Sequence, residues 1–218
     1  MKQVSLLLML ISICCISSRG QEQQFKKDEI NYFDPIQVDS SVYFLIPKMI
    51  NKESRSAYGK GKGYLPWDNY SEVYMYNSVT RESKKIFGGQ LAIILAFNPV
   101  RNWYYYNKNP WETPPGILDK HIIYLARTDN YNNDNGLDSE DPVYLYISAK
   151  TGDNLTQITP KGVNVISWNI SKDKKMILVK AQYDKTGNKK FGNGDDEVYY
   201  RIDLADEPSK IKCTQIIF

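Results

Sequence analysis

The stretch Ser71-Glu72-Val73-Tyr74-Met75-Tyr76 decides the fold, because the chain contains two more stretches like it. They are Glu140-Asp141-Pro142-Val143-Tyr144-Leu145-Tyr146 and Asp195-Asp196-Glu197-Val198-Tyr199-Tyr200. In each copy acidic residues precede a Val-Tyr strand, and a polar turn and a second short strand follow. The three valines stand 70 and 55 residues apart, a spacing typical of small β units arranged in tandem.

Segments rich in β-branched and aromatic residues recur from residue 31 to the end, and Gly, Pro, Asn and Asp separate them. No window carries the apolar stripe of a helix. The sequence therefore predicts an all-β protein. The expected strands are 32–38, 42–46, 73–77, 84–87, 92–97, 122–126, 143–147, 156–158, 163–168, 176–181, 198–202 and 211–217.

These strands group into about three four-stranded antiparallel units, over residues 31–89, 90–160 and 161–218. Four-stranded units in tandem are the blades of a β-propeller, so we expect a β-propeller-like domain over residues 31–218. Closed propellers have at least about four blades. A three-bladed ring, an open stack and an assembly completed by a partner all remain open.

One junction resembles a known repeat. Leu155-Thr156-Gln157-Ile158-Thr159 precedes Ile166-Ser167-Trp168, and Lys172-Asp173-Lys174-Lys175-Met176-Ile177 follows. This order is similar to the repeat of TolB-type, WD40-like β-propellers, although residues 169–173 replace that family's Ser-Pro-Asp-Gly turn. The resemblance implies a propeller fold in an exported protein of the cell envelope.

The N-terminus has the pattern of a secretory signal peptide over residues 1–20. Lys2 precedes an apolar run over residues 4–16, and Ser18 and Gly20 stand at the −3 and −1 positions of a cleavage site. Residues 21–30 are a polar tether. Cys15 is a candidate for lipidation, so the protein is expected in the periplasm or on the outer cell surface, either lipid-anchored or cleaved and soluble.

The charge of the chain disfavours a nucleic-acid partner. The formal net charge is +3, and loss of Lys2 and Arg19 with the signal peptide leaves +1. No basic field remains that could hold a phosphate backbone. Any contact with a membrane would be made through the lipid anchor.

Two twelve-residue insertions, 130–141 and 184–195, resemble the calcium loop of an EF-hand. Both place oxygen-bearing side chains at positions 1, 3 and 5 and a carboxylate at position 12, and Ca²⁺ takes six to eight oxygen ligands. Leu137 and Phe191 at position 8 would fix each loop to the core. The alternative is a pair of ordinary turn-rich hairpins. The candidate ligands are Asn130, Asn132, Asp134, Asp138, Asp141, Asp184, Asn188 and Asp195.

Two aromatic stretches are candidates for contact with a glycan or a protein partner, because Trp and Tyr beside amides suit sugar stacking and interface hot spots. The alternative is that these rings cover the ends of the strands. The candidate residues are Trp67, Trp103, Tyr105 and Trp111.

No nucleophile motif, zinc spacing or phosphate-binding loop appears, and His121, the only histidine, is expected on the surface of a strand. The sequence therefore predicts a non-catalytic binding or scaffold protein for an envelope protein or a glycan. The alternative is a small carbohydrate-active enzyme, which needs two carboxylates about 5–10 Å apart beside the aromatic loops. A third class is a structural envelope protein with buried aromatic loops.

Overall fold

The computed structural model describes residues 31–39, 41–50, 69–97, 118–134 and 136–218. The chain is all-β, as the sequence predicts, and within these residues its one helical element is the 3₁₀ turn η3 (Pro208–Lys210). No helix among them has the length and apolarity to cross a membrane. The strands are β1 (Ile36–Gln37), β2 (Tyr43–Met49), β3 (Tyr70–Asn77), β4 (Ser83–Lys85), β5 (Ile93–Phe97), β6 (His121–Arg127), β7 (Tyr144–Ala149), β8 (Thr156–Gln157), β9 (Val163–Ile170), β10 (Met176–Tyr183), β11 (Asp196–Asp203) and β12 (Lys212–Ile216).

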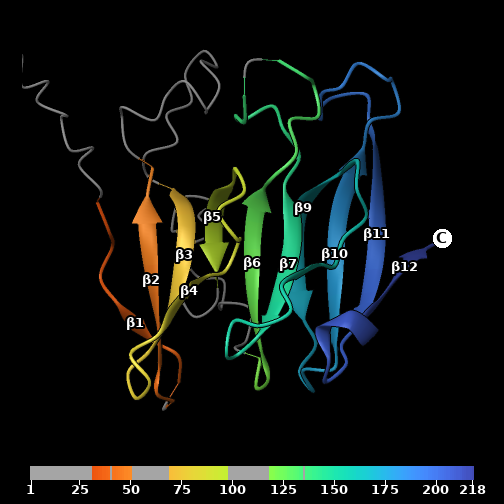
Figure 1. Ribbon diagram of the computed structural model, residues 1–218. Coiled ribbons are helices and arrows are strands. Elements are labelled where there is room, and N and C mark those ends of the chain that lie inside the picture. The colour runs from red at the N-terminus through yellow and green to blue at the C-terminus, as the bar shows by residue number, and fades with distance from the viewer. Residues whose placement is uncertain (1–30, 40, 51–68, 98–117, 135) are drawn as a thin grey trace, which may run out of the picture.

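Every strand pairs antiparallel with its neighbours in the chain, in three runs of four: β1–β4, β5–β8 and β9–β12. We call these the first, middle and last runs, and they stand in chain order in Figure 1. The three repeated Val-Tyr stretches fall on β3, β7 and β11, the third strand of each run. The repeat in the sequence therefore marks the same position in each set of strands.

The first and middle runs differ from the expected separate units, because they share one sheet of eight strands. The connection is a single pair of residues, Tyr70 on β3 and Ile94 on β5. β4 covers only residues 74–76 of β3, which leaves the start of β3 open to β5. The buried Glu72 carboxylate accepts the N–H groups of Phe87 and Gly89, each at 2.9 Å, and so folds the intervening turn back onto β3.

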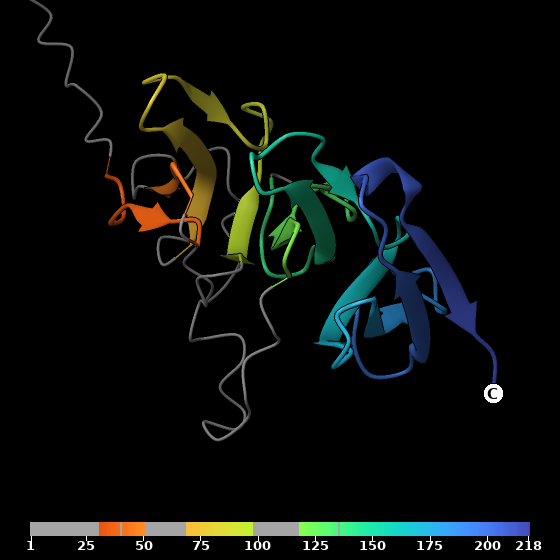
Figure 2. The ribbon, with the colours of Figure 1, turned by 90° about the horizontal axis from the view of Figure 1, so that it is seen from below.

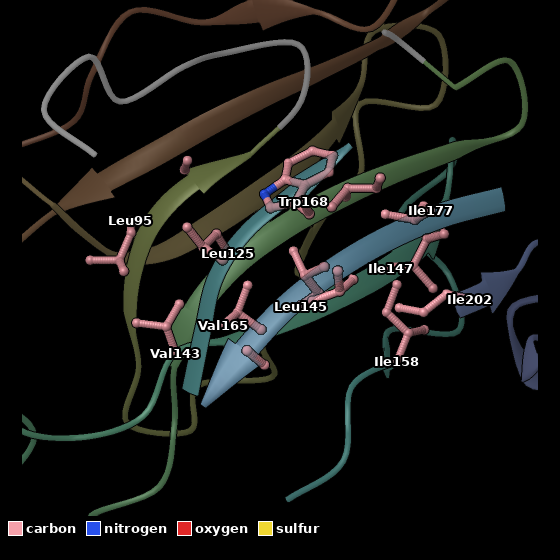
Figure 3. Close-up of a cluster of buried hydrophobic side chains, with 14 of the residues drawn as sticks. Leu95, Leu125, Val143, Leu145, Ile147, Ile158, Val165, Trp168, Ile177 and Ile202 are labelled. Atoms are coloured by element: carbon pink, nitrogen blue, oxygen red, sulfur yellow. The ribbon is translucent and has the colours of Figure 1, made fainter. Parts of the chain in front are cut away.

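Two hydrophobic cores lie on opposite faces of the middle run, because side chains alternate along a strand. On one face Ile94, Tyr124 and Tyr144 pack with Val73 and Met75 of the first run. On the other face the packing is with the last run, and Figure 3 shows it; it includes Leu95, Leu125, Leu145, Ile147, Val165, Trp168, Ile177 and Ile202. Every residue of β5 and β6 is buried as a result.

The last run turns a largely polar face to solvent. Pairing aligns Leu178 with Arg201 on this face, and Lys180 with Tyr199. Lys180 forms an ion pair of 2.7 Å with Glu197 there, and Leu178 is 38 % exposed. In Figure 2 this run stands at the far end of the row from β1.

The prediction of a surface position for His121 is wrong. The side chain is buried at the start of β6, only 6 % exposed, and its Nε2 lies 3.2 Å from the carbonyl oxygen of Asp206. Burial lowers the pKa of this imidazole below its ordinary value. The residue therefore belongs to the scaffold between the middle and last runs.

Candidate functional site

The two predicted insertions lie at the same end of the molecule, because each joins the second strand of its run to the third. The β6–β7 loop (128–143) and the β10–β11 loop (184–195) project together beyond the strand ends in Figure 1. They also contact each other. The rings of Tyr131 and Phe191 lie 5.3 Å apart between centroids, and Lys190 Nζ lies 3.2 Å from Glu140 Oε2. We call this junction the inter-loop site.

A carboxylate closes each loop in the same way. In the β6–β7 loop, Oδ1 of Asp141 accepts the N–H of Tyr131 at 2.9 Å and Oδ2 accepts the N–H of Asp138 at 2.9 Å. In the β10–β11 loop, Asp195 accepts the N–H groups of Lys185 and Gly192 at 3.2 and 3.0 Å. The donors stand at loop positions 2 and 9 in both cases, so the position-12 carboxylates have matching structural roles.

The first positions of the β6–β7 loop form a compact polar turn. The Asp134 N–H donates to Oδ1 of Asn130 and of Asn132, at 3.2 and 3.0 Å. Asn132 donates in return to Oδ2 of Asp134 at 3.2 Å, and Gly136 N–H donates to Oδ1 at 3.1 Å. Three of the predicted ligands are thus brought together, and they bond to one another and to the backbone.

Asp184 organises the corresponding part of the β10–β11 loop. Its carboxylate accepts the N–H groups of Gly187, Asn188 and Lys189 at 2.7, 3.2 and 2.8 Å. Desolvation opposes ionisation, but these donors hold the pKa of Asp184 below its usual range. The Oδ1 of Asn188 accepts the Lys190 N–H at 2.8 Å, so this loop too is held by its own backbone.

The predicted calcium ligands therefore act, in this arrangement, as acceptors for N–H groups of their own loops. Within the part of the chain that the structure describes, no cluster of three or more His, Cys, Asp or Glu side chains could hold a metal ion. A cation would have to replace several of these loop hydrogen bonds with its own ligand bonds. Calcium binding stays a prediction.

The closing carboxylate of the β6–β7 loop is deeply buried. Asp141 is 2 % exposed, and desolvation raises the pKa of its carboxyl to about 6, with the nearby Asp138 and Asp134 adding to the effect. The buried guanidinium of Arg127, at the end of β6, donates through Nε to the carbonyl oxygen of Asp141 at 2.8 Å. Arg127 thus holds the loop backbone at the point where it enters β7.

A small cavity of about 210 Å³ lies at the inter-loop site. Residues from β6, β9 and both loops contribute to its wall, so it exists only because the loops meet. The lining residues are Arg127, Ser139, Glu140, Asp141, Asn164, Lys190 and Phe191.

The two expected loop anchors behave differently. Leu137 is buried in the core between the middle and last runs, as predicted. Phe191 instead lies against Tyr131 of the neighbouring loop, so it joins the two loops and does not fix its own loop to the core. Spacing within one loop carries no information about a partner sixty residues away.

The aromatic candidates Trp67, Trp103, Tyr105 and Trp111 lie outside the described residues, as do Cys15, the signal peptide and the tether. The sequence reasoning missed Arg127, Asn164 and Lys190 of the cavity wall. Arg127 could have been identified from the sequence, because it ends an apolar strand. A charged side chain buried at such a position needs a polar partner.

No protein-family model matches the chain, and a search of curated proteins finds no match.

Proposed function

We propose that this protein is a non-catalytic, exported binding or scaffold protein of the cell envelope, and that the inter-loop site is part of its binding surface. One observation carries the proposal. Two long loops from neighbouring runs project from the same end and pack against each other through Tyr131 and Phe191. Loops held by a rigid β scaffold are the usual place for recognition.

We also propose that the three runs are blade-like units of an open, propeller-like array of the TolB type. Consecutive antiparallel pairing within each run supports this, as does face-to-face packing of the middle run against both neighbours. The polar outer face around Lys180 and Arg201 supports the open form, because a further blade would have to bury their charges. Terminal repeats of stacked arrays commonly carry such a polar face.

We propose an export signal over residues 1–20, followed either by cleavage after Gly20 or by lipidation of Cys15. Either route supports an envelope location, with an envelope protein or a glycan as partner. Trp67, Trp103, Tyr105 and Trp111 are proposed as further contacts. Calcium is proposed as a ligand that orders the loops when present.

The test compares the protein with a variant in which Asn-Gly replaces residues 184–195. Tyr183 and Asp196 are a cross-strand pair, so a two-residue turn can join them and preserve β10 and β11. We expect the protein to sediment with insoluble envelope glycan or to cross-link to envelope proteins, and the variant to lose most of this retention. Absence of retention in both assays would overturn the proposal.

The same protein preparation, incubated with glycan, also tests the alternative that the protein is an enzyme. Glu140 and Asp141 both line the cavity, so a hydrolase with two carboxylates is the competing chemistry. Release of new reducing ends from the glycan, lost in Glu140→Gln, would establish an enzyme and replace the non-catalytic proposal.

A further inference from the structure

We propose that the cavity at the inter-loop site is a subsite for one neutral pyranose ring, with Phe191 as the stacking platform. This inference rests on the proposed binding function and names the chemistry of the ligand. It places sugar recognition at the junction of the two loops.

The charges around the cavity select a neutral ligand. Arg127 and Lys190 contribute two cations, and Glu140 and Asp141 contribute two carboxylates. An anion or a cation would meet as much repulsion as attraction in this wall. A sugar hydroxyl both donates and accepts, so adjacent hydroxyls can bond to a carboxylate and to an ammonium group at once.

The Lys190–Glu140 pair is suited to such a bridge. Its atoms lie 3.2 Å apart, and the Lys190 and Glu140 side chains are 61 % and 46 % exposed. An exposed pair of this kind is weak, because water screens both charges. A pair of hydroxyls can therefore insert between the two groups at little cost.

Phe191 is the aromatic residue of the cavity wall, and an aromatic ring is the kind of group on which the apolar face of a pyranose stacks. Phe191 lines the cavity, and its ring lies 5.3 Å from that of Tyr131 at an interplanar angle of 39°. The second ring supports the first and restricts its rotamers. Fixed aromatic rings are effective platforms because little side-chain entropy is lost on binding.

The size of the cavity limits the occupant to one ring. Its volume of about 210 Å³ is below the range of about 300–1,000 Å³ for pockets that hold drug-sized ligands. A longer glycan would place one residue here and the rest outside. The wall is also fixed before binding, because Arg127 bonds to the Asp141 carbonyl oxygen and Asn164 Oδ1 accepts the Val143 N–H at 2.9 Å.

Saturation-transfer NMR on the purified protein tests the proposal. The probes are the methyl glycosides of glucose, galactose, mannose and N-acetylglucosamine. We expect transfer to the ring protons of at least one probe, and a Kd raised about tenfold in Phe191→Ala through loss of the stacking surface. Lys190→Gln at the exposed rim should weaken binding too. Because this side chain is exposed, the substitution tests the site even if Phe191→Ala disturbs the fold.

Two matched controls accompany these variants. Lys189→Asn changes the adjacent lysine, which does not line the cavity and whose φ of 59° asparagine tolerates. Phe218→Ala removes an aromatic ring that is 95 % exposed. Both should leave the Kd within about twofold. Equal weakening in the controls would overturn the assignment to this cavity.

Other outcomes separate this inference from the function on which it rests. No transfer to any of the four probes, with retention on envelope glycan or protein intact, would overturn the pyranose subsite alone. Displacement of a bound probe by inorganic phosphate at equal concentration would show an anion site and overturn the neutral-ligand argument.

Discussion

The backbone N–H of Tyr131 donates to Oδ1 of Asp141 at 2.9 Å, and this bond closes the β6–β7 loop across ten residues of chain. The N–H of Lys185 makes the corresponding bond to Asp195 in the neighbouring loop, at 3.2 Å. Because the donors and acceptors occupy the same loop positions, the two insertions are versions of one structure. They differ in burial, since Asp141 is buried and Asp195 is half-buried.

Asp141→Ala should lower the free energy of unfolding by about 1–3 kcal/mol, because it leaves the buried N–H of Asp138 and the half-buried N–H of Tyr131 without their acceptor. Asp195→Ala should cost less, because water can reach its donors. Urea unfolding of both variants measures the difference, with Asp141→Asn as a control that keeps one acceptor oxygen. An Asp141→Ala variant as stable as the wild type would contradict the closing role.

Gly152→Ala should destabilise the protein more than Gly187→Ala. Both residues have positive φ, +79° and +71°, so each substitution carries about 1–2 kcal/mol of backbone strain. A Cβ at position 152 would also clash with Ile86 Cδ1 and approach Met75 Cε at 3.2 Å, whereas position 187 is open. We expect overpacking to add about 1–3 kcal/mol at Gly152. Thermal unfolding compares the two variants. Equal losses of stability would show that a Cβ at position 152 does not clash with Ile86 and Met75.

His121 should make stability depend on pH below neutrality. Burial lowers the pKa of the imidazole from 6.5, while the Asp206 carbonyl oxygen and the charge of Asp206 oppose this and Lys120 and Lys150 add to it. The unfolded chain then takes up the proton first as the pH falls. The contribution of His121 is therefore complete above pH 6.5 and decreases as the pH falls through 6.5 to the folded-state pKa.

Unfolding free energies of the wild type and His121→Gln at pH 7.5, 6.5 and 5.5 isolate this contribution, because other titrating groups are shared. The difference between the two proteins should shift against the wild type as the pH falls. A constant difference would mean that the imidazole titrates alike in the folded and unfolded chains.

Calcium should raise the melting temperature if the loops exchange their internal hydrogen bonds for a cation. A metal that binds only the folded protein stabilises it by about 2.7 kcal/mol at a hundredfold excess over its Kd, which corresponds to about 5–10 °C here. The shift relative to EDTA should disappear in Asp134→Ala, whose side chain is exposed, so that the apo fold is little affected. Identical melting curves in EDTA and in excess calcium would leave both loops as ordinary hairpin turns.

The strand pattern was predictable because the apolar and aromatic runs are short and bounded by turn residues, and every expected strand overlaps an observed one. The loop spacing also identified Asp141 and Asp195 as equivalent residues. What spacing could not reveal is the partner of each oxygen, because a backbone N–H and a cation attract the same carboxylate. The contact between Tyr131 and Phe191 was equally inaccessible, since it depends on how two runs stack. His121 was misplaced for the same reason: the carbonyl oxygen that contacts its ring belongs to Asp206, far along the chain.

The middle run is buried on both faces, while the last run is polar on its outer face. This asymmetry restricts how such a chain could grow by gene duplication. A copy of residues 93–157 inserted beside the original would find an apolar surface on each side. A copy added after β12 would instead face Lys180 and Arg201. The structure would therefore tolerate an added run inside the array better than one packed on the outer face of the last run.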